Sequence, residues 1–510
     1  MTTQRKSKKL FNFRLIAALA LSLITGIISG ALFAYFALEG IYLLVPFVVV
    51  SVPFAICTVK YKSLSLTVCF ALVIAVFFIG ALAIFFYCRS FTLSEITVGE
   101  TYLIEGKVEK VGVTPGGTVY LVIGNARAGG VKLGGKVIAY LGKYAGDYCE
   151  KGYTVKFYAS LSKESLFEGG EVSYAAQNSI KYFCSVSGGL ESTWGFSLFG
   201  AANGAIRRAL FDNLDGETAS VCFAMLTGDS SLISQGTLTS FRYGGVAHLF
   251  AVSGLHIGVI FGALTLLFKK LPVNRYVSAA VRVGVILLYS GVCNFTPSSI
   301  RATVMCAVSV IASLSYAKND SLNSLSLAAL ILLLINPLYL FGAGFLLSFG
   351  SVLGVIMLNR NLKSALRFLP EKLREPTSVG LSVQLSTAPT QFACFGYVSW
   401  AGLFLNVLII PVISVAFLLL LFCTLASVVF PAAAGALVSF SAMPIRLLIN
   451  LVVAAGFENA VILRTFGLWI YVPFVLVLIG LSDKFNLKPF WRSTLCSVAI
   501  VCFSLGLVAI

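Results

Sequence analysis

Long runs of apolar residues recur along the chain. Most of them have the length of about 20 residues that an α-helix needs to cross the hydrocarbon core of a bilayer. The runs that predict spans are 15–38, 41–59, 64–87, 246–268, 277–293, 300–316, 322–335, 340–358, 379–398, 403–429, 434–455, 462–481 and 493–510. The pattern predicts a polytopic α-helical membrane protein of about 12 or 13 spans, of which 322–335 is short enough to be re-entrant.

Between residues 91 and 185 the pattern changes to short alternating segments separated by glycine-rich turns. Segments 101–108, 118–122, 136–140 and 153–157 alternate apolar and polar positions, as half-buried strands do. They predict a small all-β domain of about five strands, most simply a barrel.

From 191 to 214 the pattern becomes amphipathic, which predicts a helix along the outer membrane interface. From 215 to 243 it is too polar for a simple span, which predicts short re-entrant or interfacial helices. The sequence thus divides into N-terminal transmembrane helices (1–90), the β domain (91–185), interfacial helices (186–243) and a C-terminal transmembrane domain (244–510).

Charge fixes the expected orientation. Lys and Arg outnumber Asp and Glu by 37 to 20, but the basic residues gather in short loops between apolar runs, so their excess is only weak support for a nucleic-acid partner. The positive-inside rule assigns these loops, together with the N-terminus, to the cytoplasm and the β domain to the outside. The basic segment 1–14 precedes an apolar run too long for a signal peptide, so we expect an uncleaved first span.

Most of the 12 cysteines lie in apolar runs and are expected to act as small hydrophobic residues. Cys149 and Cys184 differ because they lie in the polar outer segment, which would face an oxidising compartment. We therefore predict a disulfide between them, with two free thiols as the alternative.

Both histidines of the chain lie in one stretch, 248–258, which also contains Ser253 and Gly254. Ionisable groups at membrane depth are costly, so His248 and His256 should face a cavity, a pathway or each other. Gly254 beside Ser253 weakens the helix, as in the broken segments that line cavities. The stretch predicts an inner surface that moves or handles a substrate.

A metal site is not expected here, because no Cys, Asp or Glu joins the histidines. The chain has no glycine-rich phosphate loop, so ATP hydrolysis is not expected. We expect no cofactor. Ser253 and His256 would form a hydrolytic dyad only if the imidazole reached the hydroxyl as a base and donors held an oxyanion. Neighbours on one helical turn usually point alongside each other, which makes hydrolysis the weaker interpretation.

Two further polar residues lie within predicted spans. Arg301 begins an apolar helix, and its guanidinium must find an anion, carbonyl groups or water. Contact with a phosphate is the functional interpretation, and a structural or snorkelling arginine is the alternative. Gln384 belongs to a polar stripe with Thr387 and Gln391, which predicts either a pore lining or interhelical hydrogen bonds.

Taken together, these motifs resemble the signature of the ComEC family, the DNA-uptake channels of bacterial natural competence. The matching segments are 228–229, 241–242, 244–258, 296–302, 320–337, 344–353 and 384–411, the last with Pro389, Gly396 and Asn406. The N-terminal spans and the outer β domain, with its two cysteines, are similar to the OB-type module of that family. The resemblance covers nearly the whole chain.

The resemblance implies a non-enzymatic channel that moves one DNA strand across the bacterial cytoplasmic membrane during transformation. The outer β domain would hold DNA at the entrance, with Tyr120, Tyr140, Tyr144 and Tyr158 available for stacking. Its acidic and basic residues nearly balance, so composition indicates no strong basic groove. Single-stranded DNA and membrane lipid are the expected partners. Family analogy adds a surface DNA receptor, a cytoplasmic ATPase and a separate nuclease, and homo-oligomerisation stays open.

Many ComEC-like proteins continue into a metallo-β-lactamase-like domain, whereas this chain ends at Ile510 and contains no His-x-His-x-Asp-His cluster. We therefore expect another protein to degrade the second strand. The residues expected to line or shape the DNA path are His248, Ser253, Gly254, His256, Arg301 and Gln384. The alternatives are a transporter of another polymer or solute and, less favoured, an intramembrane hydrolase that uses Ser253 and His256.

Overall fold

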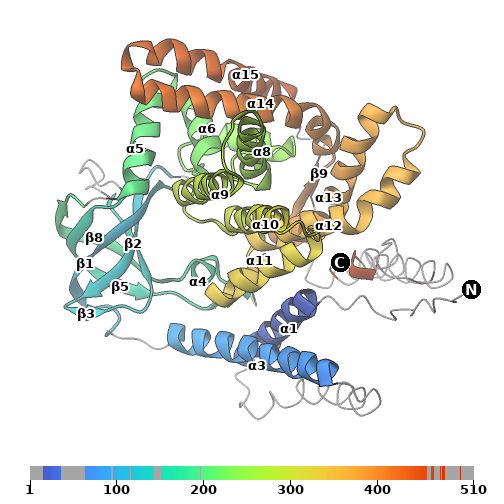
Figure 1. Ribbon diagram of the computed structural model, residues 1–510. Coiled ribbons are helices and arrows are strands. Elements are labelled where there is room, and N and C mark those ends of the chain that lie inside the picture. Colours follow the sequence, from blue (N-terminus) through green and yellow to red (C-terminus); the bar gives the residue numbers. More distant parts are fainter. Residues whose placement is uncertain are drawn as a thin grey trace, which may run out of the picture.

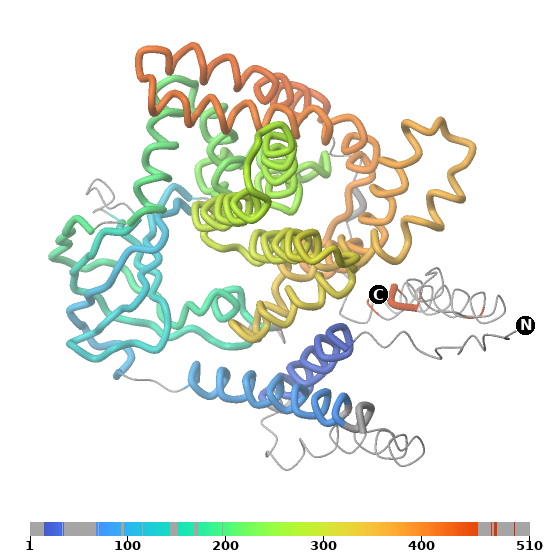
Figure 2. The backbone as a smooth tube through the Cα atoms, in the orientation of Figure 1, coloured from blue at the N-terminus to red at the C-terminus, as the bar shows by residue number. Residues whose placement is uncertain are grey.

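The computed structural model describes residues 15–35, 64–92, 96–114, 116–142, 151–168, 171–195, 197–456 and 461–463, together with residues 471, 474–476 and 494. A β-barrel lies on one side of the molecule and the larger group of helices on the other, with α1 and α3 packed together beneath them (Figure 1). The chain passes from α3 into the barrel and from the barrel into the larger helical group (Figure 2).

Seven helices among the described residues are long and apolar enough to cross a membrane. They are α1 (Leu15–Tyr35), α3 (Leu64–Thr92), α9 (Arg275–Val292), α10 (Pro297–Leu314), α12 (Ala343–Ala365), α14 (Ala401–Val429) and α15 (Ala434–Ala455), the last preceded by η5 (Pro431–Ala433). A shorter apolar helix, α11 (Ser321–Ile335), is followed by η4 (Pro337–Phe341). The predicted multi-pass membrane class is confirmed. The spans predicted at 41–59, 462–481 and 493–510 lie wholly or largely outside the described residues.

Glycines bring α1 and α3 into close contact. A Cβ at Gly26 would lie 2.1 Å from the Phe77 carbonyl oxygen, and one at Gly80 would lie 2.6 Å from the Leu23 carbonyl oxygen. Membrane helices pack closely through such small residues, because lipid offers no hydrophobic driving force between them. The large apolar side chains on the outer faces, such as Leu21 at 63% exposure, are then left for lipid.

The barrel contains five principal strands: β1 (Thr101–Val113), β2 (Val119–Ala128), β4 (Lys136–Tyr140), β5 (Thr154–Lys163) and β8 (Ile180–Thr193). They follow the order β1-β5-β8-β4-β2 and close through antiparallel pairing of β1 with β2, while β4 and β8 run parallel. Short strands β3 (Val131–Lys132), β6 (Phe167–Glu168) and β7 (Glu171–Val172) lie beside them. A closed five-stranded barrel of this order is OB-like, which confirms the predicted β domain. Its last strand continues past the boundary expected at 185.

The predicted disulfide is not supported. Cys184 is a free, buried thiol whose Sγ contacts the carbonyl oxygen of Ile138 at 3.6 Å, and Cys149 lies outside the described residues. The sequence argument relied on the compartment alone, whereas the alternation of β8 points Cys184 into the barrel core. Burial there raises the pKa of the thiol to about 12.

Between the barrel and the later helices lie α5 (Leu198–Phe211), α6 (Gly216–Thr227), α7 (Gln235–Tyr243), η3 (Ala247–Leu249) and α8 (Gly254–Lys270). For 215–243 the sequence predicted short re-entrant or interfacial helices, and their place relative to the membrane stays a prediction. Within the molecule, α6 is buried from Thr218 to Thr227, and its apolar side chains belong to the same core cluster as those of α14 and α15. Close packing against these apolar helices buries α6 despite its modest hydrophobicity.

The remaining described elements are α13 (Glu371–Phe395), which packs along α12, and a small two-stranded antiparallel sheet of β9 (Tyr397–Ser399) and β10 (Val461–Leu463). Within α13, a Ser386 side chain lies against Gly354 of α12, and Thr387 and Gln391 hydrogen-bond to each other at 2.9 Å. At these positions, the polar side chains of the predicted stripe therefore make contacts within α13 and between α13 and α12.

The barrel is attached to the helices at several points. Short helix α4 (Tyr174–Gln177) follows β7, and the carbonyl of Gln177 accepts a 3.1 Å hydrogen bond from Asn336 at the start of η4. On the α3 side, Lys181 donates to the Ser90 carbonyl at 2.9 Å, and Tyr87 shares a 2.8 Å hydrogen bond with Ser179. The barrel is thus a docked part of the molecule.

Candidate functional site

Helix α8 begins at Gly254 because Ser253 and His256 cap it. The Ser253 Oγ accepts a 3.2 Å hydrogen bond from the Leu255 N–H, and Nδ1 of His256 accepts one of 3.2 Å from the Ser253 N–H. This is a capping box in which histidine takes the position usually held by Glu or Gln. The span predicted from 246 therefore becomes helical only at Gly254, so His248 in η3 and His256 in α8 do not share one helix.

His256 is almost fully buried, at 1% exposure, and its ring meets that of Phe417 edge-on at 4.6 Å. Because Nδ1 accepts from the backbone, the neutral ring carries its proton on Nε2, which has no hydrogen-bond partner among the described residues. The Ser253 Oγ lies 3.3 Å from Nδ1. Both groups are occupied by the helix cap, which gives this pair a structural role and does not resemble an activated nucleophile.

Arg301 is the most unusual charged group in the membrane-spanning helices that the structure describes. It is 5% exposed, its Nη1 donates to the carbonyl oxygen of Ser348 on α12, and its guanidinium lies 6.0 Å from the Phe349 ring centre. Its Nε has no hydrogen-bond partner among the described residues. No ion pair within that part of the chain neutralises its charge.

The start of α8 lies directly against this guanidinium. A Cβ at position 254 would stand 2.7 Å from Nη2 of Arg301, so any larger residue there would displace the guanidinium. The N-terminus of a helix carries a partial positive charge, and its first N–H groups bind anions. A buried cation beside a helix N-terminus is electrostatically unfavourable unless an anionic group lies close to both.

The structure brings Ser253, Gly254, His256 and Arg301 together, and the two imidazoles are close enough to interact electrostatically. His248 itself is solvent-exposed.

Gln384 lies apart from this group. It is half-buried on α13, with Nε2 3.5 Å from the carbonyl oxygen of Ser399. The Ser399 hydroxyl in turn donates to the carbonyl of Tyr243. Next to it, Gly245 crosses Gly402 so closely that a Cβ at 245 would lie 2.6 Å from the Gly402 Cα. Gln384 therefore supports the loop that leads into η3.

Sequence reasoning missed Ser348, Phe349 and Phe417. Ser348 and Phe349 belong to a segment that carried the family resemblance, 344–353, although nothing in it indicated a contact with Arg301. Ser348 acts through its backbone carbonyl, which a side-chain pattern does not reveal. Phe417 is one of 41 phenylalanines and lies in an unbroken apolar run, so no signal distinguished it.

A second candidate surface lies on the barrel. Tyr120 of β2 pairs with Tyr140 of β4, their rings are 6.3 Å apart, and the Phe183 ring stacks on Tyr140 at 6.4 Å. All three side chains are half-buried, whereas Tyr174 of α4 is 76% exposed. OB barrels bind oligonucleotides on the face of their second and third strands, which here are β2 and β4.

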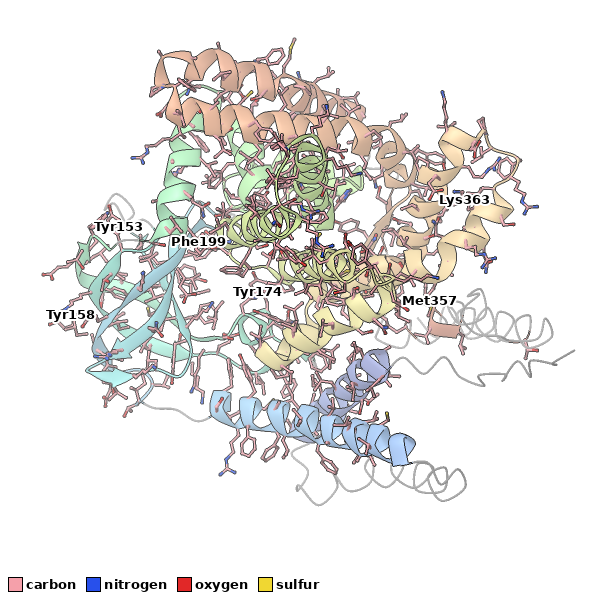
Figure 3. The ribbon with its side chains drawn as sticks, in the orientation of Figure 1. Tyr153, Tyr158, Tyr174, Phe199, Met357 and Lys363 are labelled. Atoms are coloured by element: carbon pink, nitrogen blue, oxygen red, sulfur yellow. The ribbon has the colours of Figure 1, made fainter. Side chains whose placement is uncertain are left out.

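This aromatic face is turned toward the helices. Lys110 of β1 lies 3.5 Å from the carboxylate of Asp229, which follows α6, and it interacts electrostatically with Tyr120 and Tyr174. Tyr174 lies between barrel and helices, while Tyr158 lies on the far side of the barrel (Figure 3). Of the other tyrosines proposed for stacking, Tyr144 lies outside the described residues.

These features define a multi-pass membrane protein with an OB-like barrel docked onto its helices. A family model described as "Competence protein" matches residues 225–482, slightly more than half of the chain, and the chain belongs to this family. The family predicted from the sequence motifs is thereby confirmed.

Two relatives are similar over shorter stretches. "ComE operon protein 3" of Bacillus subtilis (strain 168) is 29% identical over 195 residues, which are 38% of this chain and 25% of that protein. An uncharacterized protein of Aquifex aeolicus (strain VF5) is 29% identical over 174 residues, 34% of this chain and 38% of that protein. The chain thus spans about a quarter of the first relative's length and under two fifths of the second's. No solved structure gives a significant match.

Proposed function

We propose that this protein is a channel for single-stranded DNA in the bacterial cytoplasmic membrane and that it acts in natural transformation. Its barrel would lie outside the cell and its N-terminus in the cytoplasm, the orientation that the positive-inside rule favours. Membership of the competence protein family supports a role in DNA uptake. By analogy, a surface DNA receptor, a cytoplasmic ATPase and a separate nuclease would cooperate with it.

One structural observation carries the proposal: the oligonucleotide-binding face of an OB-like barrel is turned toward membrane helices. Bases stack on aromatic side chains with little sequence preference, at about 1–3 kcal/mol each. Tyr120, Tyr140 and Tyr174 offer such surfaces beside Lys110. A strand held there would already lie next to the loop that begins at Asp229, which favours delivery into the helical domain over storage on an isolated barrel.

Within the helical domain, the buried Arg301 and the start of α8 would contact the phosphates of the passing strand. In this proposal His248, Ser253, Gly254 and His256 shape the same part of the path, and Gln384 supports it through Ser399. A phosphate fits the chemistry because Arg301 has hydrogen-bonding capacity left at Nε. The capping role of Ser253 and His256 favours a channel over the hydrolase interpretation.

The test measures uptake of labelled duplex DNA into a DNase-resistant form in a competent host. Deletion should abolish protected DNA. Arg301→Ala should lower it at least about tenfold, because a hydrogen bond to a charged group contributes about 1.5–3 kcal/mol. Arg301→Lys should retain part of the uptake, since a lysine keeps the charge but loses the guanidinium geometry.

A matched control is Arg282→Ala. Arg282 on α9 is only partly buried, and it donates to the Ser278 carbonyl at 3.2 Å and to the Thr265 hydroxyl at 3.3 Å. Its loss should leave uptake within about twofold of the parent at equal protein levels, because its partners Ser278 and Thr265 lie outside the group around Arg301. Unchanged protected uptake in the deletion strain would overturn the DNA-channel function and favour transport of another polymer or solute.

A further inference from the structure

The turn between α12 and α13 carries a second group of cations, separate from Arg301. It encloses a cavity of about 510 Å³ that is lined by Arg360, Asn361, Lys363, Ser364, Arg367 and Arg374. Lys363 lies on the side of the molecule opposite Tyr158 of the barrel (Figure 3). Every lining side chain is polar and four are cationic, so the cavity is built for a hydrated anion.

The turn is held in shape by its own contacts. Arg374 donates from Nη2 to the carbonyl oxygens of Arg367 and Leu369, at 3.1 and 2.9 Å. These hydrogen bonds occupy backbone acceptors of the turn. Beneath the cavity, the hydroxyl of Ser378 on α13 donates to the side-chain oxygen of Asn359 on α12 at 2.7 Å. Arg374 thus has a structural role, whereas Arg360, Lys363 and Arg367 line the cavity without holding the end of the turn.

An exposed aromatic residue is next to one of these cations in the sequence. Phe368 follows Arg367 in the turn and is 79% exposed. The positive-inside rule explains basic residues in a cytoplasmic loop, but it does not require a cavity or an exposed phenylalanine beside them. Cations combined with an exposed aromatic ring are typical of proteins that bind single-stranded nucleic acid, where phosphates meet the charges and a base stacks on the ring.

A membrane lipid is the competing ligand, and the molecule offers a comparison. A second cavity of about 590 Å³ lies where α3 meets the barrel, and its walls include Phe85, Phe91 and Leu166 together with Arg89 and Lys163. Apolar walls below cations suit acyl chains beneath a headgroup. Among the residues that the structure describes, no apolar one lines the cavity at the α12–α13 turn, which favours a polyanion without acyl chains.

We propose that this cavity binds the sugar-phosphate backbone of single-stranded DNA, with a base stacked on Phe368. The assignment of the site as the cytoplasmic exit rests on the proposed function, whereas the binding itself does not. Helix α12 joins the two cationic sites, since Ser348 holds Arg301 and Arg360 lies about 18 Å further along the helix axis at 1.5 Å per residue. Helix α12 would therefore contact the DNA strand at two positions along its length, near Ser348 and near Arg360.

The experiment uses the full-length protein in nanodiscs of zwitterionic lipid, with a photo-crosslinking benzoyl-phenylalanine in place of Phe368. Crosslinking to labelled oligo(dT) is titrated to half-saturation. The triple variant Arg360→Gln, Lys363→Gln, Arg367→Gln should raise the half-saturating concentration about tenfold. It should also lower the slope of log affinity against log salt by about 2, because each lost phosphate contact removes about 0.7.

A matched control removes three exposed charges elsewhere: Lys269→Gln, Lys270→Gln and Lys318→Gln. It should leave crosslinking from position 368 unchanged. Equal loss in both triple variants, or loss in neither, would overturn the site. So would a cavity variant that keeps oligo(dT) binding but loses binding to phosphatidylglycerol vesicles, which would identify a lipid contact.

A substitution at Glu375 should change the affinity for oligo(dT) in the opposite direction. It forms an ion pair with Lys363, so Glu375→Gln should free this ammonium group and strengthen oligo(dT) binding about two- to threefold. Unchanged or weaker binding would contradict a role for Lys363. The two experiments are independent. A negative crosslinking result would contradict the cavity site but not the channel function, which DNase-protected uptake tests. A negative uptake result would contradict the channel function but not the binding of oligo(dT) at the cavity.

Discussion

Gly254 lies so close to the guanidinium of Arg301 that a side chain there would displace it, and this contact joins the start of α8 to α10. The sequence singled out Ser253, Gly254, His256 and Arg301 because each is a polar residue or a glycine in an apolar surrounding, where its presence has a cost. That signal could not reveal Ser348, whose contribution is a backbone carbonyl. The same signal placed Gln384 in one group with Ser253 and Arg301, although Gln384 contacts Ser399 and Arg301 contacts Ser348.

Replacing Gly254 by alanine should displace the Arg301 guanidinium. Overpacking of this kind costs about 1–3 kcal/mol, so the variant should unfold at a lower temperature in detergent and lose most protected DNA uptake. Gly258→Ala, one turn along α8, meets no atom within 4 Å and should stabilise the helix by roughly 0.5–1 kcal/mol. If the two variants behave alike, the close approach to Arg301 is not important for folding or uptake.

At the scale of the elements, hydropathy found most of the described helices but not their ends. The apolar run from 246 predicted one continuous span, whereas η3 and the Ser253 cap delay α8 to Gly254. A hydropathy pattern reports which residues prefer an apolar surrounding, and it does not report which backbone donors a side chain satisfies. The β domain was easier to predict, because two-residue alternation directly reflects the inside and outside of a barrel wall.

The barrel also makes the state of Cys184 testable. Its pKa is raised by burial from an ordinary 9.0 to about 12, so near neutral pH its reactive thiolate is about a thousandfold scarcer than in an exposed cysteine. Maleimide labelling of the folded protein at pH 8 should therefore spare Cys184, whereas labelling after denaturation without reductant should modify it. Mass spectrometry that finds Cys184 in a disulfide would restore the bridge predicted from the sequence.

For the whole molecule, the important feature is how the barrel is fixed to the helices. Lys110 on β1 and Asp229 after α6 join the two parts at 3.5 Å, with side chains 39% and 17% exposed. Burial lowers the pKa of Lys110, but Asp229, Tyr120 and Tyr174 raise it by more, so its net pKa is raised. The contribution of Lys110 to stability is therefore present at neutral pH and is lost only as the pH rises through that pKa.

Reversing one of these charges should loosen the aromatic face of the barrel from the helices. We expect Lys110→Glu and Asp229→Lys each to increase hydrogen exchange in β1 and around residue 229 and to lower protected DNA uptake. The double exchange should recover about 1 kcal/mol of coupling, as partly exposed pairs do. The same reversals at Lys156 and Glu105, a 3.2 Å ion pair within the barrel, should leave docking unchanged. If the Lys110 and Asp229 effects simply add, the pair does not hold the barrel against the helices, and the contacts of α4 with η4 and α3 must maintain its orientation.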